Sequence, residues 1–455
     1  MGPGFRRGDS GDLNIAHTKE STAMNLDSLL QITLDRCVKG LPPAAAPVPL
    51  GEVGKRGWNL LKGDLPMPVA VIKRAALDHN SRWMRRFLEL TDARIAPHGK
   101  TTMAPQLFAK QLADGAWGIT VATVGQMMVC RSVGVERVVL ANQLIGRQEI
   151  ATVADELRRD PAFDFYCLVD SLEGVRRLVD GVGAAAIGRP LQVLLEGGIA
   201  GGRTGCRTTD EALAVARAVK AATPHLALRG VEGFEGLLTS GTAAEQDAKV
   251  AAFLDYLVEI ARLCAGEKLF APGPIILTAG GSAFFDLAAM RLHNAVAPQG
   301  VEVVIRSGCY LTHDSKSYRD MIARLLERMP AAKSLGEGLK PALEVWAYVQ
   351  SRPEAGRMIA TMGKRDVGFD VTLPMLEQWY RPGVHSTPQR SDGLGTVVAL
   401  NDQHAHIEVP DDAPFQVGDL LSFGVSHPCT TFDRWQLIYE IDERHNVIGA
   451  IRTFF

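Results

Sequence analysis

The chain has 455 residues, of which 46% are apolar and 22% charged, a composition typical of a globular protein long enough for two or three domains. Its formal net charge of −2 gives no reason to expect nucleic acid or an acidic membrane surface as a partner. No apolar run reaches the roughly 18 residues that cross a bilayer, so a membrane protein is not expected either.

The N-terminal part of the chain is polar and mixed in charge, without the apolar stretch of a secretory signal. We expect residues 1–24 to be a disordered tail and residues 25–65 to form a segment and linker that pack on a later domain. Seven cysteines are scattered without the paired spacing of a disulfide framework. An odd, dispersed set indicates free thiols in a reducing compartment, and we therefore expect a cytoplasmic protein.

Residues 66–320 alternate strand-like and helix-like runs. After a strand–helix opening at 69–90, eight strand-like runs follow, at 93–96, 118–122, 137–141, 163–169, 191–195, 228–231, 274–278 and 301–305. This alternation predicts parallel strands joined by crossover helices, and eight such strands close a (β/α)8 TIM barrel. An open doubly wound sheet is the rival fold, but no Gly-x-Gly-x-x-Gly motif follows the first strand. Residues 321–455 predict a separate, mostly antiparallel β-domain.

In a TIM barrel the catalytic residues lie just after the strands, at their carboxyl ends. Lys100 follows the first barrel strand, where desolvation at the barrel mouth would expose a nucleophilic amine for Schiff-base chemistry. The plainer interpretation is a surface lysine. Gly280, Gly281 and Ser282 follow the seventh strand and open a helix, so backbone N–H groups and a hydroxyl can approach an anion. A lysine after strand 1 and a phosphate cradle after strand 7 form the layout that a phosphorylated aldehyde cofactor needs.

Three further motifs are open to a functional and a plain interpretation. Tyr310 follows the eighth strand and could bond the same phosphate, although buried tyrosines commonly have structural partners. Arg203 stands among four glycines after the fifth strand, either close to a planar or anionic ligand or solvated in a loop. His427 and Cys429 suit a borderline-soft ion such as zinc, with water and substrate completing the coordination, or they are a buried His beside a free Cys.

Taken together and in this order, these motifs resemble fold-type III enzymes that use pyridoxal 5′-phosphate (PLP), and most closely the D-serine dehydratase and D-threonine aldolase family. The resemblance rests on Pro97-His98-Gly99-Lys100-Thr101, Gly118-Ile119-Thr120-Val121-Ala122-Thr123, Gly280-Gly281-Ser282, Ser307-Gly308-Cys309-Tyr310 and His427-Pro428-Cys429. It implies that Lys100 is the Schiff-base lysine and that His98 and Arg203 contact PLP. It further implies that Gly280, Gly281, Ser282 and Tyr310 hold the phosphate and that His427 and Cys429 bind zinc.

The chain departs from the family pattern at two places. Phe234 stands where relatives tend to carry the tyrosine of Tyr-Glu-Gly, so a hydroxyl is missing there. Residues 402–405 stand where relatives often read Glu-His-Gly, which leaves a role for His404 in doubt.

The activity implied by the resemblance is the conversion of a D-3-hydroxy amino acid such as D-serine into a 2-oxo acid and ammonia, in a homodimer. Cleavage of the Cα–Cβ bond, as in a D-threonine aldolase, is the main alternative; the His-x-Cys pair favours dehydration because aldolases tend to carry His-x-Asp. A racemase or decarboxylase of the same fold is a further alternative. A non-catalytic PLP carrier would resemble the barrel alone, so the large C-terminal domain argues against it.

Overall fold

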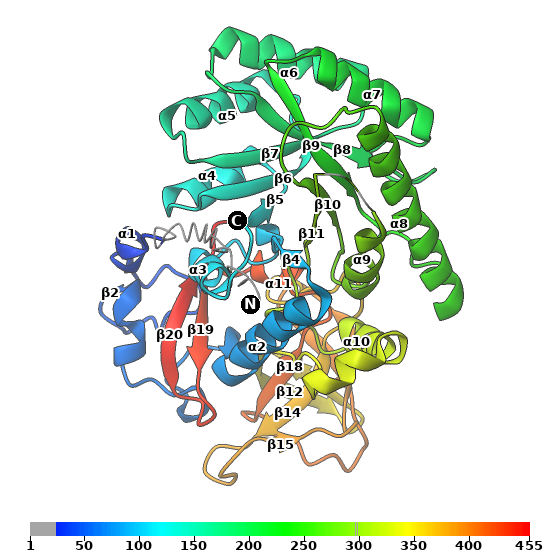
Figure 1. The fold of residues 1–455 in the computed structure, drawn as a ribbon. Coiled ribbons are helices and arrows are strands. Elements are labelled where there is room, and N and C mark those ends of the chain that lie inside the picture. The colour runs from blue at the N-terminus through cyan, green and yellow to red at the C-terminus, as the bar shows by residue number, and fades with distance from the viewer. Residues whose placement is uncertain (1–23, 296, 298) are drawn as a thin grey trace, which may run out of the picture.

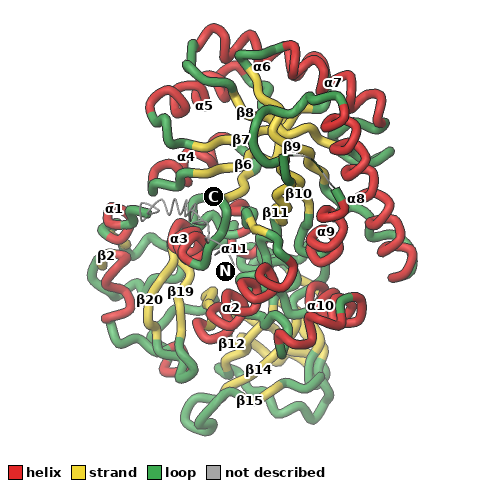
Figure 2. Tube along the Cα trace, in the orientation of Figure 1, coloured by secondary structure: helices red, strands yellow, loops and turns green. Residues whose placement is uncertain are grey.

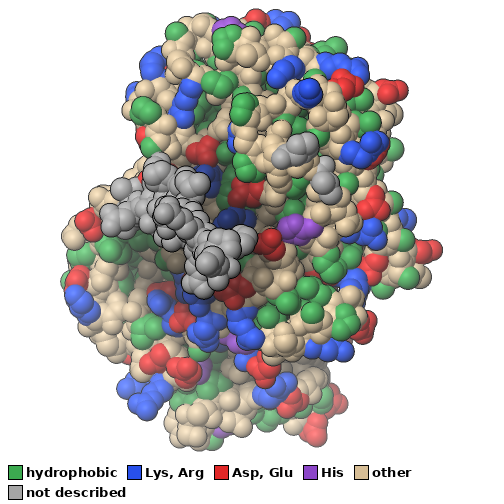
Figure 3. Space-filling view, in the orientation of Figure 1, with side chains coloured by type: hydrophobic (Ala, Val, Ile, Leu, Met, Phe, Trp, Pro, Cys, Tyr) green, Lys and Arg blue, Asp and Glu red, His purple; other side chains and the backbone are tan. Residues whose placement is uncertain are grey.

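The structure is a computed structural model that describes residues 24–295, 297 and 299–455. It consists of a parallel barrel and a second, mainly antiparallel β-domain (Figure 1). All but the last residue of the predicted N-terminal tail lies outside the described residues. Within the described part, no helix has the length and apolar character needed to cross a bilayer. Acidic and basic side chains are interspersed over the face shown in Figure 3, as the small net charge suggests.

Eight parallel strands form the barrel in the order β4-β11-β10-β9-β8-β7-β6-β5. The circle closes between the first two strands, where Trp117 N–H donates to the Ile95 carbonyl at 2.7 Å and Thr120 N–H donates to the Pro97 carbonyl at 2.9 Å. Each strand overlaps one of the eight predicted runs, which confirms the TIM barrel. The strands are β4 (Arg94–Ile95), β5 (Ile119–Val121), β6 (Arg137–Gln143), β7 (Asp164–Val169), β8 (Leu191–Gly197), β9 (Leu226–Gly233), β10 (Ile275–Ala279) and β11 (Val301–Ile305).

Crossover helices surround the barrel strands (Figure 2). Each turns an apolar stripe to the sheet; in α5 that stripe is Ile150, Val153, Ala154 and Leu157. Two helices begin with a capping box, which satisfies N–H groups that a helix end leaves without partners. The helices are α2 (Arg74–Thr91), α3 (Pro105–Ala113), α4 (Val124–Ser132), α5 (Arg147–Arg159), α6 (Leu172–Ala185), α7 (Thr209–Ala221), α8 (Ala243–Gly266), α9 (Phe285–Arg291) and α10 (Ser317–Arg328).

The second domain is a ten-stranded sheet with the path β15-β14-β18-β12-β13-β17-β16, to which β3, β19 and β20 attach beside β12. A short helix, α11 (Cys429–Phe432), connects β18 to β19. The strands are β3 (Val69–Lys73), β12 (Leu343–Glu354), β13 (Arg357–Ala360), β14 (Met375–Tyr380), β15 (Gln389–Arg390), β16 (Thr396–Leu400), β17 (Ala405–Glu408), β18 (Leu420–Gly424), β19 (Leu437–Ile441) and β20 (Val447–Arg452).

Two segments ahead of the barrel in the chain belong to this second domain in space. Strand β3 pairs antiparallel with β12 and parallel with β19, although the sequence placed it at the opening of the barrel region. The segment at 25–65, with α1 (Asp27–Leu30), β1 (Thr33–Leu34) and β2 (Val48–Pro49), packs in one apolar cluster with Trp346 and Tyr439. The predicted domain limits themselves stay a prediction.

Candidate active site

The loop after β4 carries Lys100. It forms a single 3-10 turn, Gly99–Thr101, and is tied to the neighbouring strands because His98 N–H donates to the Arg306 carbonyl at 3.2 Å. Gly99 and Thr101 are buried, whereas Lys100 is exposed. The structure therefore places Lys100 at the carboxyl end of the first barrel strand, as predicted, but without the expected desolvation.

His98 lies inside this loop among cations. Burial lowers the pKa of His98 well below its usual range, and the charges of Lys100, Arg306 and Arg203 lower it further. The imidazole is thus neutral, and its buried Nδ1 has no hydrogen-bond partner among the described residues. These charges belong to residues that follow β4, β8 and β11, so the ends of these three strands lie near one another around His98.

The glycine-rich loop after β10 already binds an anion, and that anion belongs to the chain. The N–H groups of Gly280 and Gly281 donate to the two carboxylate oxygens of Glu235, at 3.1 and 2.6 Å. Glu235 is fully buried, and Gly280 has a φ of +86°, a conformation that favours glycine. A Cβ on Gly281 would lie 2.9 Å from the Phe234 ring. Phosphate binding by residues 280–282 stays a prediction.

Hydrogen bonds join the loops after β10 and β11. Ser307 Oγ donates to the Gly280 carbonyl at 3.2 Å, and Cys309 N–H donates to Ser282 Oγ at 3.4 Å. A Cβ on Gly308 would collide with Thr101 Oγ1 and the His98 carbonyl, so this glycine allows the loop after β11 to approach the Lys100 loop. The loops after β4, β10 and β11 therefore meet; they carry the predicted lysine, the predicted phosphate cradle and the Ser307–Tyr310 motif.

A charged layer lies below the mouth, inside the barrel. The buried Arg306 guanidinium donates to Thr278 Oγ1 at 2.8 Å, to the Gly233 carbonyl at 3.0 Å and to the Glu232 carboxylate. Burial raises the pKa of Glu232 to about 7, although Arg306 opposes the rise. Burial also raises the pKa of Glu196. None of these three side chains, Arg306, Glu232 and Glu196, was among the predicted site residues.

Two predicted cofactor ligands have other partners in this structure. The buried Tyr310 hydroxyl bonds Gln111 and lies near Asp114, so it faces α3, in accord with the structural interpretation. Burial raises the pKa of Tyr310 further above its usual range. The Arg203 guanidinium lies 4.5 Å from the centre of the Phe234 ring, in a cation–π contact at the mouth.

His427 and Cys429 reach the Lys100 loop from the second domain. The Cys429 Sγ lies 3.5 Å from Thr101 Oγ1 and 3.6 Å from Cys309 Sγ. Cys309 and His427 hold the pKa of Cys429 well below its usual range, against the effect of burial. The interaction with Cys429, followed by that with Asp370, raises the pKa of His427 to about 9.

Asp370 is a member of this group that the sequence did not reveal. Its Oδ2 lies 2.6 Å from His427 Nδ1, and Thr430 Oγ1 donates to its Oδ1 at 2.7 Å. The residue lies in an irregular stretch before β14, 57 positions ahead of His427, and no motif marks it. His404, in contrast, is exposed in the turn between β16 and β17.

The residues present fit PLP and an open metal site. For PLP, the fit consists of Lys100 at the mouth, the glycine loops that a Cβ would obstruct and the orphaned His98 Nδ1. For a metal, a histidine oriented by a carboxylate beside a thiol is the arrangement of a metal-binding histidine. The part of the chain that the structure describes holds no group of three or more His, Cys, Asp and Glu side chains suited to a metal. Two protein donors would leave positions for water and substrate.

Comparisons with known proteins agree with this architecture. Residues 72–296 match the family model "Alanine racemase, N-terminal domain", and residues 342–441 match the model "Putative serine dehydratase domain". Together the two matches span more than half of the chain. A D-threonine aldolase from Arthrobacter sp. is 25% identical over 401 residues, which cover 86% of this chain and 90% of the aldolase.

Three solved structures share the fold. The D-threonine aldolase from Filomicrobium marinum has a TM-score of 0.70 at 20% identity and covers 87% of this chain and 97% of its own. The D-threo-3-hydroxyaspartate dehydratase from Delftia sp. HT23 has a TM-score of 0.67 at 20% identity, with coverage of 87% and 99%. A cysteine-to-alanine variant of such a dehydratase, described as a metal-free form, has a TM-score of 0.66 at 19% identity, with coverage of 87% and 99%.

The matches to both domains and the order of the motifs at the barrel mouth indicate the same family. The chain belongs to the D-serine dehydratase and D-threonine aldolase-like family of fold-type III PLP enzymes.

Proposed function

We propose that this protein is a PLP-dependent, zinc-assisted lyase that converts a D-3-hydroxy amino acid such as D-serine into a 2-oxo acid and ammonia. The observation that carries the proposal is the position of Cys429, whose Sγ lies 3.5 Å from Thr101 Oγ1, one residue from Lys100. Cys429 of the second domain therefore lies beside the barrel loop that carries Lys100, which supports a site shared by the two domains.

In this proposal Lys100 holds the cofactor and moves the proton. Its exposed ε-amino group would hold PLP, and Nζ would accept the α-proton of the substrate. PLP, when bound, supplies an electron sink for the negative charge that develops at Cα. Arg203, which is in cation–π contact with Phe234, would offer positive charge to the cofactor, and His98 Nδ1 would accept a hydrogen bond.

His427 and Cys429 would hold the zinc, with Asp370 orienting the imidazole. Zinc, when bound, supplies a Lewis acid for the 3-hydroxyl group of the substrate, which must leave as hydroxide. Loss of the α-proton and hydroxide gives an enamine, and water then releases ammonia and leaves the 2-oxo acid. A cysteine-to-alanine variant of a D-threo-3-hydroxyaspartate dehydratase of this fold is described as a metal-free form, which supports a metal in such dehydratases.

Retro-aldol cleavage is the second candidate, because the curated relative and one similar structure are D-threonine aldolases. That reaction takes the proton from the 3-hydroxyl group and releases an aldehyde and glycine. The His-x-Cys pair supports dehydration over this alternative, since aldolases of the family tend to carry His-x-Asp.

The test is a product analysis with the purified holoenzyme on D-serine, D-threonine, D-threo-3-hydroxyaspartate and their L-isomers, with and without EDTA followed by zinc. We expect ammonia and a 2-oxo acid from a D-isomer, lost with EDTA and restored by zinc. Glycine and an aldehyde would establish the aldolase instead, and full activity after chelation would reject the zinc role.

We further propose a homodimer and a reducing compartment. Fold-type III sites are usually completed across a dimer, and the exposed Lys100 of one chain leaves room for such a partner. All seven cysteines are unpaired. Sedimentation of the holoenzyme at several concentrations tests the dimer, and a monomer with full activity would reject it.

A further inference from the structure

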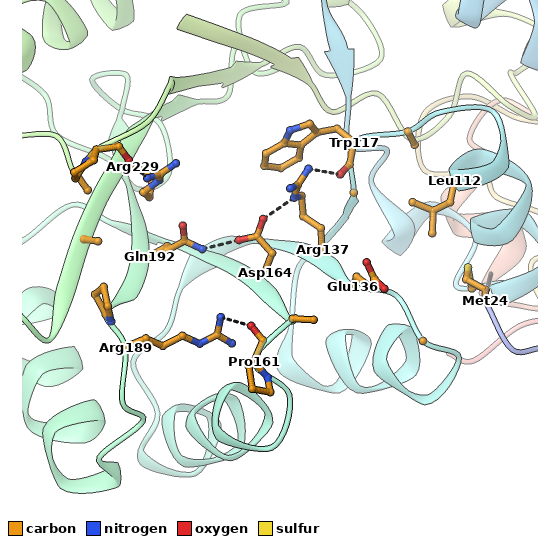
Figure 4. Close-up of a pocket in the computed structure, with 18 of the residues that line it drawn as sticks. Met24, Leu112, Trp117, Glu136, Arg137, Pro161, Asp164, Arg189, Gln192 and Arg229 are labelled. Atoms are coloured by element: carbon orange, nitrogen blue, oxygen red, sulfur yellow. Dashed lines mark hydrogen bonds and ion pairs between the residues drawn. The ribbon is translucent and has the colours of Figure 1, made fainter. Parts of the chain in front are cut away.

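A large cavity lies at the end of the barrel opposite the Lys100 loop. Its volume is about 1120 Å³, and it is lined by residues at or near the amino ends of β5 to β9, among them Gly118, Arg137, Asp164, Gln192 and Arg229 (Figure 4). The catalytic region of a TIM barrel is at the carboxyl ends of the strands. This basal cavity is therefore separate from the site that we assign to PLP and zinc.

The basal cavity has an excess of positive charge. Its lining contains three guanidinium groups, Arg137, Arg189 and Arg229, against the two carboxylates of Glu136 and Asp164. Arg137 and Asp164 neutralise each other, since Arg137 Nε lies 2.6 Å from Asp164 Oδ2. Among the described residues no carboxylate forms an ion pair with Arg229, whereas Arg189 lies within electrostatic range of the Asp160 carboxylate. The charge of Arg229 is therefore the more available to a ligand.

Arg189 and Arg229 are held in place by carbonyl oxygens only. Arg189 donates to the carbonyls of Pro161 at 3.1 Å and Phe163 at 2.8 Å, and Arg229 donates to the carbonyl of Pro272. The Nε atoms of both side chains are buried and have no hydrogen-bond partner in the described chain. A guanidinium fixed in this way is held in one orientation, which suits recognition of a carboxylate or phosphate.

The rest of the lining is mainly apolar. The Trp117 ring, which also lines the cavity, lies 4.3 Å from the Arg137 guanidinium and 5.5 Å from the Tyr166 ring. Pro190 and Pro272 lie beside Arg189 and Arg229 in the lining. A ligand that suits this combination has anionic groups attached to a flat apolar part.

We propose that the basal cavity is a binding site for a small aromatic polyanion, with its anionic groups toward Arg189 and Arg229 and its ring against the apolar lining. Of the two arginines, Arg229 is the better anchor, because one backbone carbonyl engages it whereas four engage Arg189. If these arginines served only to hold loops, their substitution would change stability without changing anion binding.

Isothermal titration calorimetry on the full-length, PLP-loaded protein tests this inference, with phthalate and inorganic phosphate as probes at constant ionic strength. The variants are Arg229→Gln and, as a matched control, Arg262→Gln, an exposed arginine of α8 that is paired with Glu259. We expect saturable binding of both probes with phthalate the tighter, an affinity lower by about tenfold or more in Arg229→Gln, and no change in Arg262→Gln.

Absence of saturable binding, or equal affinity of the two variants, would overturn the inference. Tighter binding of phosphate than of phthalate would overturn the aromatic part of it. If Arg229→Gln does not fold, as judged by circular dichroism, Arg229→Lys replaces it: weaker binding in that variant supports a guanidinium contact, and unchanged binding refutes it. Because binding is measured directly, the result does not depend on the proposed lyase activity.

Discussion

The candidate active site has two halves that differ in how firmly their residues are held. In the barrel half, the fully buried Glu235 binds the N–H groups of Gly280 and Gly281, and Ser307 bonds back to the same loop. In the half from the second domain, the side chains of His427 and Asp370 are 26% and 47% exposed. The hydrogen bonds of the first half are made among the barrel loops themselves, whereas the side chains of the second half are partly exposed to solvent.

This difference matches two separate tasks. A cofactor that stays bound through many turnovers is best held by loops whose conformation is fixed before it binds. A catalytic metal must exchange water for substrate, so its ligands need an open position. We infer that the barrel half holds PLP and that the second domain supplies the exchangeable part of the site.

Removal of the Lys100 amine should have the largest effect. We expect Lys100→Ala to lower kcat by about 10²- to 10⁴-fold or more and to abolish the visible Schiff-base absorbance, because no other group is assigned to hold PLP or to accept the α-proton. Absorbance spectra and single-turnover kinetics measure both effects. Lys249→Ala, on the exposed face of α8, is the control. A variant that keeps the absorbance would show that another lysine carries the cofactor.

Removal of the Cys429 thiol should impair the function of the second-domain half and leave that of the barrel half intact. We expect Cys429→Ala to keep the Schiff-base spectrum but to lose zinc and about 100-fold or more of elimination activity, since a direct metal ligand matters at least as much as its supporting residues. Metal analysis by plasma mass spectrometry and the ammonia assay provide the readouts. Cys37→Ala, at an exposed cysteine, should change neither. Full zinc content in Cys429→Ala would contradict the assignment.

The charged layer under the barrel half should make stability depend on pH. The pKa of Glu232 is raised from 4.5 to about 7 in the folded chain. The folded state therefore favours the protonated form, so this stabilisation is complete below pH 4.5 and is lost as the pH rises through about 7. The loss amounts to about 3 kcal/mol at most.

Glu232→Gln, which is neutral at every pH, should not show this loss. Urea unfolding of the wild type, Glu232→Gln and the exposed control Glu443→Gln at pH 5, 6, 7 and 8 measures it. If the unfolding free energies of wild type and Glu232→Gln run parallel from pH 5 to pH 8, Glu232 ionises as an ordinary carboxyl.

More of the barrel half than of the second-domain half could be predicted from the sequence. Lys100, Ser282 and Cys309 follow strands β4, β10 and β11, and the carboxyl ends of parallel strands in a barrel meet at one place. Their convergence therefore follows from counting strands. The pair His427 and Cys429 was recognised as a motif, but the position of Cys429 beside Thr101 depends on how α11 packs against the barrel, which no local pattern encodes.

Other features could not have been derived in this way. Asp370 stands in an irregular stretch, and its bond to His427 exists only because two loops of the second domain meet. The motif around Phe234 was noticed for its missing hydroxyl, whereas the structural role found there belongs to the next residue, Glu235. Strand β3 is a buried apolar run that would suit either sheet. In each case the outcome depends on tertiary contacts between distant segments.

Replacement of Asp370 should have a moderate effect, which is confined to zinc affinity and so to the second-domain half of the site. We expect Asp370→Asn to lower zinc affinity by about 10- to 100-fold, because the amide orients His427 less firmly and no longer supports its basicity, while PLP affinity stays unchanged. Competition with a chromophoric chelator measures zinc affinity. Asp370→Glu should recover part of the loss, and Asp392→Asn, at an exposed position, is the control. An unchanged zinc affinity would show that Asp370 serves only to hold Thr430.

The smallest effect concerns the anion that the barrel half already contains. Glu235→Gln keeps the shape of the side chain but offers one oxygen in place of two, so the N–H group of Gly280 or Gly281 loses its acceptor. A lost charged hydrogen bond of this kind corresponds to about 1.5 kcal/mol, or roughly tenfold in PLP affinity, because the loop is less rigid when the cofactor arrives. Titration of the apoenzyme with PLP, followed at the Schiff-base absorbance, measures this change independently of turnover. If PLP instead bound more tightly to Glu235→Gln, the carboxylate would be a competitor for the phosphate and not a support of its loop, and the barrel half would be less preorganised than its hydrogen bonds indicate.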